Sequence, residues 1–363
     1  MTLRLVPLCC LAAASLANAS SLKESYEKDF AIGVAVSPDD VADPARQELI
    51  KKNFNSLSFE NVLKWDFVEP KEGEFHYELA DKIVDFARAN GMKLVGHTFV
   101  WHSQTPDWVF VGPDGNPASR ELLLERLKKH IQTVMTRYKG VISTWDVANE
   151  IASDEDGKSP YRQSRWFEIL GPEVVVKAFE FAREADPFAT LLYNDYGIEA
   201  GPKHDRAVQI LKDLRKAKAP ISGIGLQSHI SIVYPPVSEI ETSIRNFARL
   251  GLQVHITELD MSVYSGFDEE KRNLYPDACP PDLLKQQADR YGELFRMFRR
   301  NKSHIARVTF WNVHDGVSWL NQFPVPNRRN HPLLWDSDLK PKPAYDAVIS
   351  AGAPKSRLPK PTQ

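Results

Sequence analysis

Short apolar runs rich in β-branched and aromatic residues alternate along this chain with longer amphipathic stretches of helical spacing. The pattern predicts strands over residues 30–36, 55–61, 92–97, 141–147, 191–195, 221–227, 252–257 and 305–311. It predicts helices over residues 44–53, 80–90, 121–138, 172–185, 204–217, 238–250, 283–299 and 345–350. Eight strand-and-helix units in regular alternation indicate an α/β fold, a (β/α)8 TIM barrel that forms a single domain over residues 20–351.

Polar and aromatic side chains stand at or just after the ends of seven of the predicted strands. A single polar residue at a strand end usually caps a loop or is solvated, but a series of seven argues for one shared site. In a barrel these ends meet at the carboxyl face, where such barrels keep their active sites. The candidate residues are Glu60, Asn61, Lys64, His97, Trp101, Asn149, Glu150, Asn194, Tyr196, Gln227, His229, Glu258, Asp260, Trp311 and Trp319.

Two of these candidates, Glu150 and Glu258, indicate the kind of reaction. Paired carboxyl groups can act as general acid and as nucleophile or base, which is the pair that glycoside hydrolysis needs. The nucleophile has to stay ionised, and His229 and Asp260 are candidates for keeping Glu258 so. Asp260 lies two residues beyond Glu258, and hence on the same face if the strand continues. The alternative for His229 is a hydrogen-bonded core histidine.

The first residues have the pattern of a secretory signal peptide, predicted over residues 1–19. Arg4 precedes an apolar run from residue 5 to 16, and Ala17-Asn18-Ala19 supplies a small-residue cleavage site. The run is too short to span a bilayer and no other stretch reaches that length, so we expect a soluble, secreted or periplasmic protein with no membrane partner. Residues 352–363 are polar and proline-bearing and are expected to form a flexible tail.

Charge and motifs exclude several other classes of function. The net charge of −2, without a clustered basic face, argues against a nucleic-acid partner. Only Cys279 lies outside the predicted signal peptide, and His97 and His102 lack a zinc-binding spacing. The chain has no P-loop, no complete dinucleotide-binding glycine motif and no G-x-S-x-G motif. We therefore expect no internal disulfide, no metal and no cofactor.

Two further features have an ordinary structural explanation. Tryptophan stacks on pyranose rings, but of the eight in the chain we expect Trp65, Trp145, Trp166 and Trp335 to pack in the core. The acidic run of residues 154–157 lacks the spacing of an EF-hand, so a solvated loop is expected there rather than a calcium site.

Motifs at two strand ends resemble those of glycoside hydrolase family 10, the endo-β-1,4-xylanases. Trp145-Asp146-Val147-Ala148-Asn149-Glu150 is similar to the acid/base motif of that family, and Ile256-Thr257-Glu258-Leu259-Asp260 to its nucleophile motif. Supporting stretches follow in the family's order at residues 60–65, 96–102, 193–196, 223–229 and 311–319. The resemblance covers nearly all of the chain after the predicted signal peptide.

The resemblance implies an endo-1,4-β-xylanase that hydrolyses internal bonds of xylan and xylo-oligosaccharides with retention, Glu150 being the acid/base and Glu258 the nucleophile. Asn149 would bond the 2-hydroxyl of the sugar at subsite −1. The residues around that sugar would be His97, Trp101, Gln227 and His229, and those at subsite −2 would be Glu60, Asn61, Lys64 and Trp311. Trp319 would close over the site, and Tyr196 would face the aglycone side. A monomer is the default expectation.

Three positions depart from the family's pattern. Ala148 replaces a common valine, Gly197 stands where asparagine often follows, and Asn312 replaces a usual glycine. The segment from Asn312 through Arg329 is long for the family, so we expect it to alter the shape of the cleft and the preferred chain length.

Two alternatives to the xylanase stay open. A catalytically silent carbohydrate-binding protein would have no reason to keep both glutamates. Another retaining β-glycanase on the same barrel, acting on glucan or mannan, would differ at the wall that faces C5 of the sugar. Crowding by Trp311 and Trp319 there would exclude the hydroxymethyl group of a hexose.

Overall fold

The structure, a computed structural model, describes residues 21–157, 159–266 and 270–353. The predicted signal peptide and all but the first two residues of the predicted tail lie outside these ranges. Among the described residues, no helix combines the length and the apolar character that crossing a bilayer requires.

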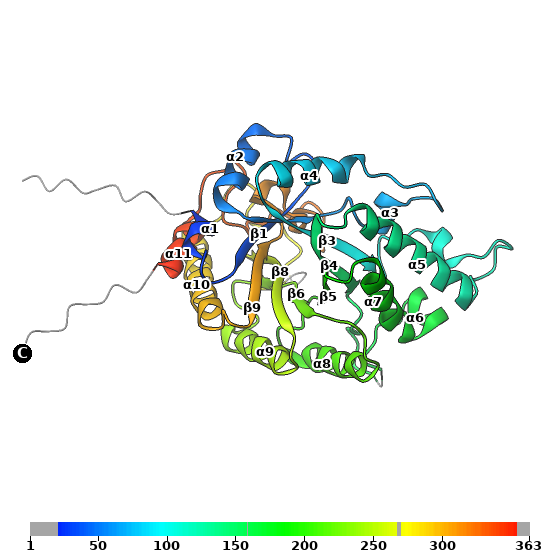
Figure 1. Cartoon of the computed structure of the whole chain (residues 1–363). Coiled ribbons are helices and arrows are strands. Elements are labelled where there is room, and N and C mark those ends of the chain that lie inside the picture. The colour runs from blue at the N-terminus through cyan, green and yellow to red at the C-terminus, as the bar shows by residue number, and fades with distance from the viewer. Residues whose placement is uncertain (1–20, 158, 267–269, 354–363) are drawn as a thin grey trace, which may run out of the picture.

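Eight parallel strands close into a barrel, as the sequence predicts (Figure 1). Around the ring they are β1 (Ala31–Val36), β2 (Ser56–Phe59), β3 (Lys93–Val100), β4 (Ile142–Asn149), β5 (Thr190–Asp195), β6 (Gly223–Leu226), β8 (Gln253–Ser262) and β9 (Ile305–Phe310). Pairing of β9 with β1 closes the ring. A short further strand, β7 (His229–Ser231), follows β6 and pairs with the end of β8.

Helices pack around the outside of this ring (Figure 1). The longer ones are α2 (Pro44–Asn53), α4 (Glu78–Ala89), α5 (Arg120–Arg137), α7 (Glu173–Ala185), α8 (Gly201–Lys216), α9 (Val237–Arg249), α10 (Pro281–Arg300) and α11 (Pro343–Gly352). The sequence predicts each of them. Short helices that it does not predict are α1 (Leu22–Ser25), α3 (Trp65–Val68) and α6 (Arg165–Leu170), with 3-10 turns at η1 (Asp107–Phe110), η2 (Asp315–Val317) and η3 (Trp319–Asn321).

Local sequence sets where some of these helices begin. Asp43 caps α2 by accepting a hydrogen bond from the backbone N–H of Arg46, and Pro44 occupies the first turn, where its missing N–H costs nothing. Ser119 caps α5 in the same way, with the N–H of Leu122 as donor.

The main difference from the prediction is the length of β4 and β8. Polar residues usually mark the end of a strand, yet β4 runs through Asn149 and β8 runs through Glu258 and Asp260 to Ser262. At the mouth of a barrel such side chains find polar partners on neighbouring strands, so the backbone ladder continues past them. The pairing of β7 with β8 places His229 beside Asp260.

The core holds the tryptophans that the sequence assigns to it. Trp65, Trp145, Trp166 and Trp335 are each at most 5% exposed, which confirms that prediction. Trp145 packs against β3 where the chain has Gly96, and a Cβ atom there would lie 2.1 Å from the indole ring. The glycine therefore allows β3 and β4, which carry site residues at their ends, to lie closely side by side.

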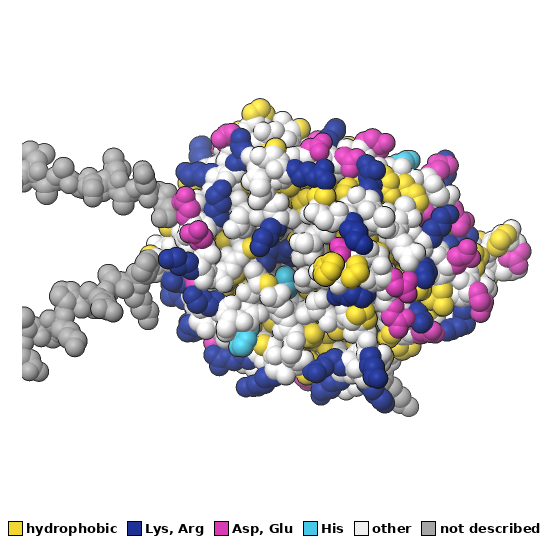
Figure 2. Space-filling view, viewed as in Figure 1, with side chains coloured by type: hydrophobic (Ala, Val, Ile, Leu, Met, Phe, Trp, Pro, Cys, Tyr) yellow, Lys and Arg dark blue, Asp and Glu magenta, His cyan; other side chains and the backbone are white. Residues whose placement is uncertain are grey.

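The surface carries charges of both signs. On the face shown in Figure 2, lysine and arginine side chains are interspersed with aspartate and glutamate. Such a mixture, with a net charge of −2, offers little attraction to a polyanion.

Candidate active site

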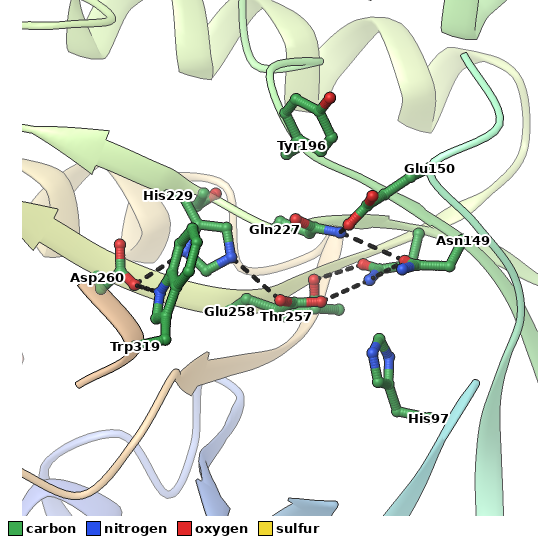
Figure 3. A network of polar contacts seen from close by, with 12 residues as sticks. His97, Asn149, Glu150, Tyr196, Gln227, His229, Thr257, Glu258, Asp260 and Trp319 are labelled. Carbon is green, nitrogen blue, oxygen red and sulfur yellow. Dashed lines mark hydrogen bonds and ion pairs between the residues drawn. The ribbon is translucent and has the colours of Figure 1, made fainter. Parts of the chain in front are cut away.

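Glu150 and Glu258 lie in one group of polar side chains at the carboxyl ends of the strands (Figure 3). A chain of amides joins them. Gln227 donates from Nε2 to Oε1 of Glu150 at 3.1 Å and to Oδ1 of Asn149 at 3.3 Å. Asn194 donates from Nδ2 to the same Asn149 oxygen at 2.9 Å and to Oε1 of Glu258 at 2.7 Å. The structure thus brings the two predicted carboxylates, from β4 and β8, to one site.

Asn194 lies behind the nucleophile candidate. The sequence places it among the substrate-binding residues, but its side chain is fully buried and its contacts are with protein groups. Thr257 donates to its Oδ1 at 2.6 Å. A Cβ atom on Gly225 would lie 2.3 Å from that oxygen, so glycine in β6 is required for Asn194 to reach this position. The arrangement suits orientation of Glu258 better than contact with a sugar.

His229 bridges two carboxylates of β8. Its Nε2 lies 3.1 Å from Oε2 of Glu258, and its Nδ1 lies 2.9 Å from Oδ2 of Asp260, which also accepts a hydrogen bond from Nε1 of Trp319 at 2.7 Å. Burial alone would lower the pKa of His229, but the charges of Asp260 and Glu258 raise it to about 10. The ring is therefore an imidazolium that donates from both nitrogens, and both of its partners are carboxylates of β8.

These contacts favour an ionised Glu258. Burial of its carboxyl group would raise the pKa, because the charged form loses its water. The hydrogen bond from His229, the charges of His97 and His229 and the hydrogen bond from Asn194 outweigh that effect and lower the pKa. A carboxylate that stays charged in a buried site is suited to act as a nucleophile.

Glu150 has different surroundings. Its side chain is 14% exposed, against 6% for Glu258. Nε1 of Trp101 donates to Oε2 of Glu150 at 2.7 Å, and Nδ1 of His102 lies 3.8 Å from the same oxygen. Burial first, and then the charge of Arg162, lower the pKa of His102 to about 4, so this imidazole is neutral near pH 7. The imidazole beside Glu150 therefore carries no positive charge.

The backbone at Glu150 adopts a conformation that few residues other than glycine favour. Its φ is 55°, in the left-handed region. The N–H of Glu150 donates to the carbonyl of Asn194 at 2.8 Å, and Nε of Arg162 donates to the carbonyl of Glu150 at 2.9 Å. Both backbone polar groups of Glu150 are therefore hydrogen-bonded, which holds this residue in its left-handed conformation.

The predicted glycone residues gather around Lys64. Its Nζ donates to Oδ1 of Asn61 at 2.8 Å and to Oε1 of Gln104 at 2.9 Å, and it lies 4.9 Å from the ring centroid of Trp101. Burial lowers the pKa of Lys64, while the charges of Glu258, Glu60 and Glu150 act in the opposite direction. The charges of Glu150 and Glu258 thus both act on the ammonium group of Lys64.

Aromatic rings form a wall next to these groups. Trp311 stands edge-on to His97, with ring centroids 5.5 Å apart, and Nδ1 of His97 pairs with Asp146 at 3.0 Å. Trp319 lies 4.7 Å from the ring of His229 and stacks on Phe323 at 5.5 Å. Tyr196, predicted to face the aglycone, lies on the Glu150 side of the group (Figure 3).

Sequence reasoning assigned no role to several residues that contact this site. They are Asp146, His102, Gln104, Arg162 and Thr257, and each contacts a predicted site residue as described above. Asp146 had a signal in the sequence, because it lies four residues before Glu150 within the motif that resembles the family's acid/base motif. Arg162 had none, because it comes from a loop whose path depends on tertiary structure.

Metal binding has no support in the described part of the chain, where no group of three or more histidine, cysteine, aspartate or glutamate residues is placed to hold an ion. In the acidic loop, Asp154 pairs with Arg162 and Lys203, and Asp156 pairs with Arg206. Asp154 and Asp156, which belong to the acidic run considered as a calcium site, therefore contact cationic side chains.

The family model for glycosyl hydrolase family 10 matches residues 21–351. The chain belongs to this family. The predictions of family and fold are thereby confirmed, together with the two-glutamate, retaining chemistry that characterises family 10.

Several relatives of this family 10 protein are xylanases, and it matches some of them along most of their length. It is 42% identical to an endo-1,4-beta-xylanase of Geobacillus stearothermophilus over 332 residues, which are 91% of this chain and 98% of that protein. A solved mutant structure in complex with xylotriose has 39% identity and a TM-score of 0.87, covering 91% of this chain and 99% of that one. The chain spans 48% of another relative, the endo-1,4-beta-xylanase/feruloyl esterase of Xylanibacter ruminicola, with 40% identity over 92% of this chain.

Two departures from the family 10 pattern have one explanation in the backbone. Asn312 has a φ of 82° and Gly197 a φ of 66°. Glycine and asparagine are the residues that most readily adopt this left-handed conformation, so an exchange between them keeps the path of the chain. The third departure, Ala148, is fully buried in β4.

Proposed function

We propose that this protein is an endo-1,4-β-xylanase that hydrolyses internal β-1,4-xylosidic bonds of xylan with retention at the anomeric carbon. The observation that carries the proposal is the unequal setting of two glutamates within one family 10 site. Glu258 is held ionised by His229 and Asn194, whereas Glu150 is more exposed and lies beside a neutral imidazole.

In the first step the Glu258 carboxylate attacks the anomeric carbon of the sugar at subsite −1. The bond from that carbon to the leaving oxygen breaks, and Glu150 gives its proton to this oxygen. Hydrogen bonds from Trp101 and Gln227 hold both oxygens of the Glu150 carboxyl group in place for the transfer. The product of this step is an ester between the sugar and Glu258.

In the second step water attacks the same carbon from the face that the leaving group vacated. Glu150, now a carboxylate, takes a proton from this water, and Glu258 departs as the carboxylate that His229 and Asn194 stabilise. Two inversions at one carbon give net retention.

Sugar positions follow from the residues around the glutamates. Asn149 accepts hydrogen bonds with Oδ1, which leaves its Nδ2 as the donor for the 2-hydroxyl at subsite −1. Glu60, Asn61, Lys64 and Trp311 bind the sugar at −2, and Tyr196 supports the leaving sugar. The xylotriose complex of a 39% identical structure supports a cleft for β-1,4-linked xylose units.

Proton NMR of the mature protein with xylohexaose, and in parallel with cellohexaose, tests the function. We expect the β-anomer to appear first, from the xylose oligomer alone, before mutarotation mixes the anomers. Early α-anomer would contradict retention. Preferred cleavage of cellohexaose would identify a glucanase on this barrel, and cleavage of neither would favour a binding protein.

We also propose that the protein is exported and acts as a monomer. The pattern of residues 1–19 supports export, and N-terminal sequencing of the secreted product is expected to begin at Ser20. Sedimentation of the mature protein tests the oligomeric state.

A further inference from the structure

Asp154 is a loop residue outside the two-glutamate site, yet it contacts three residues beside that site. Oδ2 of Asp154 accepts a hydrogen bond from the hydroxyl of Tyr196 at 2.5 Å and pairs with Arg162 at 2.6 Å. Oδ1 pairs with Nζ of Lys203 at 2.8 Å. One carboxylate at the surface thus connects side chains from three separate segments. We call Asp154, Arg162, Tyr196 and Lys203 the Asp154 cluster.

Lys203 fixes the ring of Tyr196 from one side. Its Nζ lies 3.2 Å from the ring centroid, and it also pairs with the buried carboxylate of Asp195 at 3.0 Å. The ion pair with Asp195 holds the ammonium group of Lys203 in place, and this group covers one face of the Tyr196 ring. The guanidinium carbon of Arg162 also lies 5.8 Å from the centroid of the Tyr196 ring, so two cations hold this ring in place.

Arg162 connects the cluster to the proton donor. One guanidinium nitrogen contacts both Asp154 and the hydroxyl of Tyr196, at 2.6 and 2.8 Å. Its Nε donates to the backbone carbonyl of Glu150 at 2.9 Å. The same side chain that orients the ring of Tyr196 also holds the strained peptide of Glu150.

We propose that Asp154 is a positioning residue for the leaving-group side of the reaction: through Arg162, Lys203 and Tyr196 it fixes the ring on which the leaving xylose unit stacks. The proposal rests on the proposed xylanase function. It gives the acidic loop a role in binding the aglycone, although Asp154 touches no sugar itself.

The effect belongs in substrate binding rather than in the stability of the fold. The Asp154 side chain is 42% exposed, and exposed ion pairs contribute little to stability. The barrel strands that carry Glu150 and Tyr196 are held by their own ladders. Loss of the carboxylate charge therefore frees the ring of Tyr196 without unfolding the site.

Asp154→Asn tests this by comparing two substrates. Xylohexaose places xylose units on the leaving side, whereas β-xylobiosyl fluoride loses fluoride and places no sugar there. We expect kcat/KM for xylohexaose to fall by about 10-fold, mainly through KM, which is the effect of losing one charge-assisted hydrogen bond. For the fluoride we expect a change of less than about 2-fold, because the glycone side is untouched.

Asp156→Asn is the matched control, because Asp156 lies in the same loop, is 89% exposed and pairs only with Arg206 among the described ion pairs. It is expected to behave as wild type on both substrates. Tyr196→Phe removes the hydroxyl that Asp154 holds, so the double variant with Asp154→Asn should lose little more than either single variant.

Equal losses on both substrates, no loss on either, or additive effects in the double variant would each overturn the inference. Failure of the wild-type protein to cleave xylohexaose or the fluoride would instead contradict the proposed function, so the two failures are distinguishable.

Discussion

Nδ2 of Asn194 donates a hydrogen bond to Oε1 of Glu258 across 2.7 Å, and the Asn194 side chain is fully buried. This bond is one of the contacts that lower the pKa of the nucleophile. Replacement by alanine should raise that pKa. Because the nucleophile must be ionised, activity is lost as pH falls through its pKa, and the acid limb of the kcat/KM profile of Asn194→Ala should move to higher pH. An unchanged acid limb would contradict this role.

Gly225 makes room for Asn194, and its replacement should therefore damage the site from behind. In Gly225→Ala the new methyl group would clash with Oδ1 of Asn194, and overpacking of this kind costs about 1–3 kcal/mol of stability. The displaced amide should also reduce kcat in the protein that remains folded. Gly223→Ala is the control, because its Cβ atom would meet the carbonyl of Gln253 at 2.5 Å, away from the glutamates. It should lose stability with kcat retained, as measured by urea unfolding and initial rates.

The two glutamates should respond differently to substrates with different leaving groups. Glu258→Ala should abolish turnover of every substrate. Glu150→Ala should lose about 10²–10⁴-fold on xylan, as expected for removal of a general acid, but far less on aryl xylobiosides whose leaving groups need no proton. Pre-steady-state kinetics measure the rate of the first step, glycosylation of the enzyme, for both substrate types. Equal losses on both substrate types would count against Glu150 as the acid.

His229 should make stability depend on pH in the alkaline range. Its folded-state pKa of about 10 lies above the value of about 6.5 expected in the unfolded chain. The stabilisation is therefore fully present below pH 6.5 and is lost as pH rises toward 10. His229→Asn should cost about 3 kcal/mol at pH 6, as for a broken buried pair, and clearly less at pH 10.

Urea unfolding of both proteins at the two pH values measures this change. His204→Asn is the control, because His204 is also buried but contacts the carbonyl of Ile198 and the amide of Asn246 rather than a carboxylate. A His229 difference as large at pH 10 as at pH 6 would contradict an imidazolium in the folded protein.

Trp319 should control the choice between pentose and hexose. It contacts His229 and Asp260 and is backed by Phe323, and we propose that it forms a wall beside the sugar. Trp319→Ala should raise the ratio of kcat/KM for aryl cellobioside over aryl xylobioside by about 10-fold or more, because space opens for a hydroxymethyl group. Trp319→Phe keeps much of the bulk while losing the N–H, so it should keep the preference. The proposed wall would be refuted if the alanine variant retained the wild-type ratio.

The sequence predicts the fold well because alternating apolar strands and amphipathic helices are local patterns. It also predicts that Glu150 and Glu258 lie in one site, because strand ends in a parallel barrel converge. It does not predict β7, whose three residues become a strand only by pairing with β8. Nor does it predict that Asn194 would be buried behind Glu258, since the depth of a side chain at the barrel mouth depends on neighbours such as Gly225. The sequence also does not predict the loop residues that contact Glu150, such as His102 and Arg162, because their positions depend on tertiary structure.

The chain of amides between the glutamates has a direction. An ionised Glu258 can only accept, so Asn194 must present its nitrogen to it, and that same nitrogen requires an oxygen from Asn149. The amide nitrogen of Asn149 thereby lies on the other side of its carboxamide, 3.3 Å from Nε1 of Trp101. Through Asn194, the charge on Glu258 thus determines that Asn149 presents its amide nitrogen, a hydrogen-bond donor, to the proposed position of the sugar hydroxyl. If Glu258 lost its charge, the orientation of the Asn194 and Asn149 amides would no longer be fixed by it. The ionisation state of Glu258 therefore affects how the site is arranged before a substrate binds.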